Sequence, residues 1–357
     1  MDDTLSKRHP RTAPGSTRAR AVPTGRSWLA VLLVGAPIWT GCATVRPVDD
    51  VIREMPVTAE TPQGTEVGFA TAAEVPAPTP SAAVPPAAPD AEIAVPVPDG
   101  IAAPDVLPAR DDLRAYSDRA LDEYDRLCRQ LLERARAEGA SYDELMEASR
   151  ALAFNADLRI QSHLAFRFDP ADLPEPKALI DAEDDVSSKL KGEVRSLARS
   201  SKELAEAALS LRDGDPAGRL FATLGAGLYL WSLGPIEAIA SGGATSLPKK
   251  IKALAKDHPS FEGASPLRLK GRFESRAPWP YKDKSGGVAT LEEAVKSGPI
   301  PLNLLFLGDA YWINGQEAEA VRTWELATRA DADEETKIAA PLLREIARLR
   351  VLSASSQ

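Results

Sequence analysis

The side chains that carry out most enzyme chemistry are few in this sequence, and they do not cluster. Its three histidines are His9, His163 and His258, and no H-x-x-x-H or C-x-x-C spacing brings potential metal ligands together. The G-x-S-x-G motif of a nucleophilic serine, the Walker loop and the Rossmann fingerprint are also absent from the sequence. We therefore expect no enzyme activity, no metal and no cofactor.

The acidic run at residues 183–185 is a place where neighbouring carboxylates could form a pair. Adjacent positions on a helix point in different directions, however, and such runs are usually solvated helix starts. We interpret Glu183, Asp184 and Asp185 as the solvated beginning of a helix.

The two cysteines differ in their surroundings. Cys128 falls on the apolar stripe of a predicted helix, which indicates a buried small hydrophobe rather than a reactive thiol. Cys42 follows a basic region and the uncharged apolar run at residues 28–38, which together are typical of an export signal. That run is too short to cross a bilayer, because a span takes roughly 20 apolar residues.

Gly41-Cys42 resembles the lipobox of bacterial lipoproteins, in which the cysteine is acylated and becomes the mature N-terminus. The resemblance implies lipidation at Cys42 and removal of residues 1–41 as a signal peptide, although Trp39 stands where the family usually has leucine. The alternative is cleavage after Ala43, which would discard Cys42. Residue 43 is not the aspartate that retains such lipoproteins at the inner membrane. The resemblance therefore implies the periplasmic face of the outer membrane, with a soluble periplasmic or secreted protein as the alternative.

Residues 42–110 are predicted to be a disordered tether rich in proline and alanine. Residues 46–110 hold 13 of the chain's 30 prolines, which fix φ and remove backbone donors, so neither helix nor sheet propagates. Without the first 41 residues, which hold six basic and two acidic side chains, the chain has 37 basic and 50 acidic residues and a net charge of −13. Such a charge repels phosphate backbones and argues against a nucleic-acid partner.

From residue 111 to residue 357 the apolar residues recur at steps of three and four, which predicts helices. The first ends at Gly139, and Ser141 with Glu144 forms a capping box for the second. No stretch shows the sustained alternation of a strand, so we predict an all-α domain of antiparallel helix pairs. Further helices are expected at 184–211, 216–240, 247–256, 265–277, 289–297, 302–313, 316–329 and 334–352.

The stretch at residues 220–240 contains one charged residue and could be taken for a membrane segment. Gly234 and Pro235 interrupt it after 14 residues, which is too short for a span. We interpret it as a buried central helix with Phe221, Tyr229 and Trp231 in the core.

The helix pair at residues 301–334 has the residue types of a tetratricopeptide repeat at its signature positions. Gly308 and Ala320 are expected where the two helices touch, because a larger side chain there would push them apart. Large residues fill the space around this contact: Leu304, Leu307, Tyr311 and Trp324.

The preceding unit has small residues at the matching positions, Gly271 and Gly287, and four extra residues in a loop that contains Trp279 and Tyr281. The order of features along the chain, including "FATLGAGLYLWSLG" and "GRF…APWP", resembles the tetratricopeptide lipoproteins called T-components of TRAP transporters, and related regulator-of-microtubule-dynamics proteins. The resemblance spans residues 121–352. It implies a tetratricopeptide-like α-solenoid that binds a protein partner, in the transporter case a periplasmic solute receptor, or an apolar ligand.

Repeat geometry predicts where such a partner or ligand binds. Five positions of the first helix of a tetratricopeptide unit line the concave side, and here they are Leu302, Leu305, Asp309, Trp312 and Ile313. The loop residues Trp279 and Tyr281 complete the candidate set. The alternative is that the final helix, residues 334–352, folds over this face and buries it as core.

We therefore predict a membrane-tethered tetratricopeptide-repeat binding protein that acts as a protein-interaction scaffold or transport accessory. A carrier that holds a small apolar ligand within the solenoid is the alternative. An enclosed apolar cavity would favour the carrier, and an open apolar groove would favour the scaffold.

Overall fold

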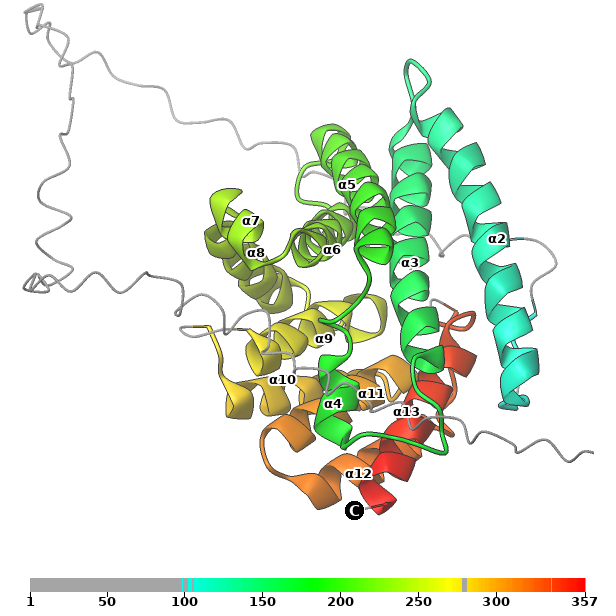
Figure 1. Ribbon diagram of the computed structural model, residues 1–357. Helices are drawn as coiled ribbons and strands as arrows, with labels where there is room; N and C mark the ends of the chain where they lie inside the picture. Colours follow the sequence, from blue (N-terminus) through cyan, green and yellow to red (C-terminus); the bar gives the residue numbers. More distant parts are fainter. Residues whose placement is uncertain (1–97, 99–101, 105, 278–280, 335, 357) are drawn as a thin grey trace, which may run out of the picture. The chain divides into compact units, whose positions relative to one another are not determined.

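The computed structural model describes residues 98, 102–104, 106–277, 281–334 and 336–356. These residues form 12 helices and no strand, so the prediction of an all-α domain is confirmed for this part of the chain (Figure 1). The predicted signal peptide, Cys42 and most of the predicted tether lie outside the described residues, and so does Trp279.

The helices carry the labels of Figure 1. Their bounds are α2 (Arg110–Ala135), α3 (Tyr142–Phe166), α4 (Pro176–Asp181), α5 (Ser188–Leu211), α6 (Pro216–Leu233), α7 (Pro235–Ala240), α8 (Gly243–Asp257), α9 (Phe261–Arg276), α10 (Lys284–Ser297), α11 (Pro301–Ile313), α12 (Glu317–Ala327) and α13 (Ala340–Ser355).

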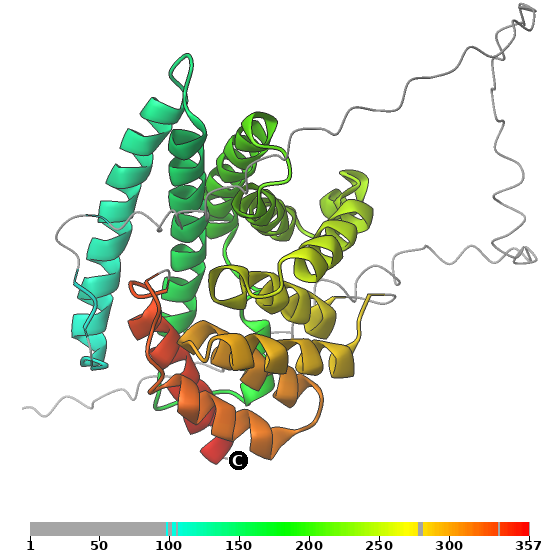
Figure 2. The same ribbon diagram turned by 180° about the vertical axis from the view of Figure 1, so that it is seen from behind.

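The first two helices, α2 and α3, lie side by side and form an antiparallel pair, seen from both sides in Figures 1 and 2. Gly139 in the turn has φ +79°, a left-handed conformation that favours glycine. The capping box of Ser141 and Glu144 is present at the start of α3. Cys128 is buried in this pair, as predicted, and burial raises the pKa of its thiol to about 11.

Helices α3, α5 and α6 pack together, and α5 approaches α6 at Gly225. A Cβ at Gly225 would lie 2.9 Å from the backbone nitrogen of Lys202, so the two helices are in close contact there. A Cβ at Gly227 would meet only a side-chain atom of Leu247, at 4.0 Å. Gly227 is therefore not at a close helix contact, and a methyl group would fit there.

The apolar stretch from residue 220 divides into α6 and α7 at Gly234, which has φ +87° and is followed by Pro235. None of the described helices is both long enough and apolar enough to cross a membrane. Phe221 is buried as predicted. Tyr229 and Trp231 are only half-buried, which corrects the prediction that they are core: Trp231 borders a pocket, and the guanidinium of Arg199 covers the ring of Tyr229 at 5.4 Å.

Two further helix pairs, α9 with α10 and α11 with α12, follow. Gly308 of α11 lies against Trp324 of α12, where an added Cβ would overlap the indole ring. The predicted contact between these helices is therefore confirmed. Trp324 and Ala320 are fully buried.

The last helix begins later than predicted, at Ala340 rather than near residue 334, and Pro341 occupies its first turn. Proline fits the first turn of a helix because the amide there has no intrahelical partner. Helix α13 packs against α3, α11 and α12 and closes the end of this group of helices. Helix α4, which the sequence pattern did not predict, is also in contact with α11 and α13.

Candidate functional site

A pocket of about 540 Å³ opens among α3, α6, α8, α9 and α11. Its wall is mainly apolar, and the large side chains that form it are Phe221, Leu224, Leu228, Trp231, Phe273 and Phe306. Helix α6 supplies the first four of these because nearly all its residues are apolar, so every side of the helix is able to face an apolar neighbour. Gly227, on the same helix, also lines the pocket and has no side chain to fill it.

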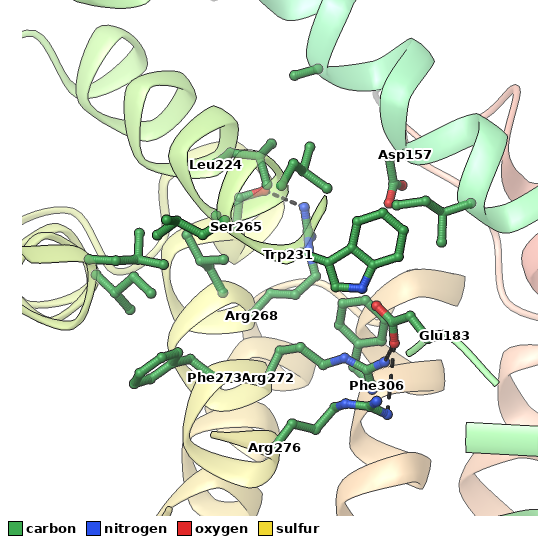
Figure 3. Close-up of a pocket in the computed structure, with 18 of the residues that line it drawn as sticks. Asp157, Glu183, Leu224, Trp231, Ser265, Arg268, Arg272, Phe273, Arg276 and Phe306 are labelled. Carbon is green, nitrogen blue, oxygen red and sulfur yellow. Dashed lines mark hydrogen bonds and ion pairs between the residues drawn. The ribbon is translucent and has the colours of Figure 1, made fainter. Parts of the chain in front are cut away.

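One wall of the pocket carries a row of arginines on α9. Arg268, Arg272 and Arg276 are four residues apart, which places them on one face of the helix. In Figure 3 Arg272 and Arg276 extend side by side toward Glu183, and Arg268 turns toward Ser265. Arg268 donates to the side-chain oxygen of Asn303 at 2.9 Å and to the hydroxyl of Ser265. These side chains form a polar edge on an otherwise apolar cavity.

Two carboxylates lie against this row. Glu183 forms an ion pair with Arg272 and a longer one with Arg276, at 3.8 Å (Figure 3). Asp184 pairs with Arg276 at 2.8 Å. Burial opposes ionisation of Glu183, but the guanidinium groups of Arg272 and Arg276 outweigh it and hold the pKa of this carboxyl below its ordinary value.

This arrangement corrects the interpretation of residues 183–185 as a solvated helix start. Helix α5 begins at Ser188, after a cap at Ser187, and the acidic run lies in the turn before it. Glu183 and Asp184 are turned inward because the arginines of α9 supply opposite charge there. Asp185 stays exposed and pairs with Arg167 at 2.5 Å.

Asp157 is the acidic residue that α3 contributes to the pocket wall. Its neighbours on the same wall are the apolar side chains of Ala153, Phe154 and Ile160. Gln161 donates to its Oδ1 at a long 3.4 Å. Burial, with a smaller contribution from Glu183, raises the pKa of Asp157 to about 6, although Arg268 and Arg272 act in the opposite direction.

The predicted binding face of α11 lies in several different environments. Leu305 is 2% exposed and Asp309 is 1% exposed. Leu305 belongs to the same core cluster as Leu342 and Leu343 of α13. The final helix therefore covers this part of α11, as the alternative interpretation held, and neither residue lines the pocket.

Three side chains of the domain donate hydrogen bonds to the carboxylate of Asp309. Arg272 donates to it at 2.9 Å, Arg350 at 3.0 Å, and the indole nitrogen of Trp324 at 3.1 Å. A carboxylate held by two guanidinium groups and an indole is a structural centre of this part of the fold.

The other candidates divide into pocket and non-pocket residues. Leu302 is buried and lines the pocket, and Tyr281, which is 37% exposed, lies at its edge. Trp312 and Ile313 are half-buried and pack against the core, with the ring of Trp312 5.6 Å from that of Trp324. Only Leu302 and Tyr281 of the described candidates therefore belong to the pocket.

Sequence reasoning missed most of the pocket, including Asp157 and the arginine row. The spacing of the arginines in "RLKGRFESR" was a visible signal, because it places three cations on one helix face. Asp157 stands in "FNADLRI", where a single acid interrupts a helix whose neighbouring positions are largely buried. The aromatic residues of α6 carried no signal that separates a pocket wall from core.

Within the described ranges, no group of three or more His, Cys, Asp and Glu residues is arranged to hold a metal ion. A comparison with models of known protein families found no match to this chain, and neither did a comparison with curated proteins.

Proposed function

We propose that this chain is a helical binding protein that carries a small apolar molecule in the pocket among α3, α6, α8, α9 and α11. The observation that carries the proposal is the pocket itself, with a volume of about 540 Å³ and a wall formed mainly by aliphatic and aromatic side chains. Ligand sites in proteins typically occupy about 300–1,000 Å³ and combine such walls with a few polar groups. An apolar molecule there would be removed from water on all sides that contact the wall.

We favour the carrier over the protein-interaction scaffold. The scaffold required an open apolar face on α11, and Leu305 and Asp309 are buried under α13 or within ion pairs. The pocket, in contrast, is formed by side chains from several helices that converge on one space (Figure 3). Its geometry favours a small molecule.

We also propose that the helix pairs α9–α10 and α11–α12 are tetratricopeptide-like and that the chain belongs with the TRAP T-component lipoproteins. The close contacts at Gly271 with Gly287 and at Gly308 with Trp324 support the repeat pairs. In this proposal Cys42 carries a lipid that tethers the domain to the periplasmic face of the outer membrane. A tethered carrier would pass its ligand to a periplasmic solute receptor.

The test compares two glycine-to-leucine variants in binding a neutral apolar fluorescent probe, N-phenyl-1-naphthylamine. Gly227→Leu adds a side chain at a residue that lines the pocket, where a Cβ would contact no atom closer than 4.0 Å. Gly192→Leu makes the same change on the exposed surface of α5, where nothing lies within 4 Å. Both variants gain helix propensity of up to about 1 kcal/mol, so any difference between them comes from the pocket.

We expect saturable binding of one probe per wild-type chain. Gly227→Leu should weaken binding by about tenfold, which corresponds to about 1.4 kcal/mol, and Gly192→Leu should leave it unchanged. Absence of saturable binding to the wild type, or equal affinities of all three proteins, would contradict the proposal.

A further inference from the structure

We infer that Asp157 is the polar recognition point of the pocket and that the molecule it selects is uncharged, apolar and bears a hydroxyl group. The inference rests on the proposed function, because it assigns a chemical class to the ligand of the same pocket.

The first argument is the unused hydrogen-bonding capacity of Asp157. Its Oδ1 accepts one long hydrogen bond, from Gln161 at 3.4 Å. Among the described residues its Oδ2 accepts none, and the carboxyl takes part in no ion pair. Figure 3 shows the carboxyl directed from α3 toward Trp231, across the pocket.

The carboxyl of Asp157 is half-buried in a mainly apolar wall, and losing part of its water without a compensating hydrogen bond is unfavourable. Desolvation of a polar group without a compensating hydrogen bond is unfavourable, and more so for an ionised group. The raised pKa of Asp157, about 6, reflects this burial. The group is still mostly ionised at neutral pH, so it acts as an acceptor there. A ligand that brings a hydrogen-bond donor would offset the cost.

The second argument is the charge balance around the pocket. Five cations line the pocket or belong to an ion-pair network that includes a residue lining it: Arg150, Arg268, Arg272, Arg276 and Arg350. Five anions meet the same criterion: Asp157, Glu183, Asp184, Glu262 and Asp309. The two sets come from α3, α9, α11, α13 and the turn before α5. The charges therefore sum to zero when Asp157 is ionised.

This balance favours a neutral ligand over a charged one. An ammonium group at Asp157 would add a positive charge near Arg268 and Arg272, and a carboxylate would be repelled by Asp157. A charge without a compensating partner is expensive in such a site. A hydroxyl donates one hydrogen bond to the carboxylate and leaves the balance unchanged.

The test measures how well four molecules with the same dodecyl chain displace N-phenyl-1-naphthylamine from the full chain. They are 1-dodecanol, dodecyl methyl ether, dodecylamine and dodecanoate. The ether keeps the oxygen of the alcohol and lacks its donor. The variant Asp157→Leu removes the acceptor, and Asp118→Leu, on the exposed face of α2, is the matched control.

For the wild type and Asp118→Leu we expect 1-dodecanol to bind about tenfold more tightly than the ether, the size of effect that one hydrogen bond to a charged acceptor gives. Asp157→Leu should bind the alcohol and the ether equally and should still bind the probe. It should also remain folded, because it replaces a desolvated carboxyl with an apolar side chain, and its thermal midpoint checks this.

The outcomes separate the two proposals. If the wild type binds the probe but binds alcohol and ether equally, the role of Asp157 is overturned and the carrier function stands. If dodecylamine or dodecanoate binds most tightly, the neutral class is overturned. If the wild type binds neither the probe nor any of the four molecules, both proposals are overturned.

Discussion

Gly271 of α9 and Gly287 of α10 face each other so closely that a Cβ on either would lie 3.0 Å from the carbonyl oxygen of the other. This contact fixes the spacing of the pair that carries the arginine row. A Cβ at Gly287 would also lie 2.8 Å from the backbone nitrogen of Ser275, and a backbone atom cannot turn away as a flexible side chain can.

We therefore predict that Gly287→Ala lowers the free energy of unfolding by about 1–3 kcal/mol, the usual cost of overpacking a close contact. Gly192→Ala is the control: with open space around it on a helix, it should stabilise the protein by about 0.5–1 kcal/mol. Chemical denaturation measures both. Equal stability of the two variants would mean that α9 and α10 do not meet at Gly287.

Asp309 joins the pocket wall to the core, because it accepts from Arg272 of α9 and Arg350 of α13. We predict that Asp309→Asn lowers the free energy of unfolding by about 3–5 kcal/mol, since it leaves the buried guanidinium of Arg350 without a compensating charge, whereas Arg272 keeps Glu183. Thermal and chemical denaturation measure the loss.

The double variant Asp309→Asn with Arg350→Met tests whether charge compensation is the cause of this loss. It removes the uncompensated cation, so the two substitutions should cost less together than the sum of their separate costs. Additive losses would show that charge compensation is not what Asp309 contributes.

The raised pKa of Asp157 predicts a dependence of stability on pH. The folded protein binds this proton more tightly than the unfolded chain does, because the pKa is about 6 rather than 3.8. The stabilising contribution is therefore complete below pH 3.8 and is lost as the pH rises through about 6.

Asp157→Asn removes this titration and keeps the shape of the side chain. We expect the free energy of unfolding of the wild type, relative to this variant, to fall between pH 4.5 and pH 7. Other carboxyls such as Glu183 titrate equally in both proteins, so the difference isolates Asp157. Parallel pH profiles of the two proteins would show that Asp157 is not desolvated.

The proposed membrane tether predicts that Cys42, which lies outside the described residues, is lipidated. Cells fed a labelled fatty acid should label the wild-type protein and not Cys42→Ala, because the cysteine thiol is the acylated group. Cys128→Ala should keep the label, since that thiol is buried in the folded domain. Equal labelling of all three proteins, or a mature N-terminus at Thr44, would contradict lipidation at Cys42.

The parts of the fold that depend on neighbouring residues were predictable from the sequence. The turn at Gly139, the capping box of Ser141 and the contact at Gly308 each follow from a local pattern with one physical reason. Helix ends were less predictable: Pro341 marks the true start of α13, whereas the apolar periodicity alone placed it near residue 334.

The pocket could not be predicted in the same way, because it joins residues that are far apart in the chain. Asp157, Trp231, Arg268 and Phe306 come from four different helices, and only the tertiary packing brings them together. The environment of the predicted binding face on α11 could not be read from the sequence either. Helix α11 is apolar on most sides, so its pattern could not show that α13 covers Leu305 while Leu302 reaches the pocket.

The most direct test of the carrier proposal is to locate a bound apolar molecule by the anomalous scattering of bromine in crystals grown with 1-bromododecane. The account predicts a bromine peak inside the pocket, within van der Waals contact of side chains such as Leu224, Phe273 or Phe306. At a concentration that only partly saturates the wild type, crystals of Gly227→Leu should show a weaker peak. Bromine found only outside the pocket, or no peak in the pocket at saturating 1-bromododecane, would contradict the account.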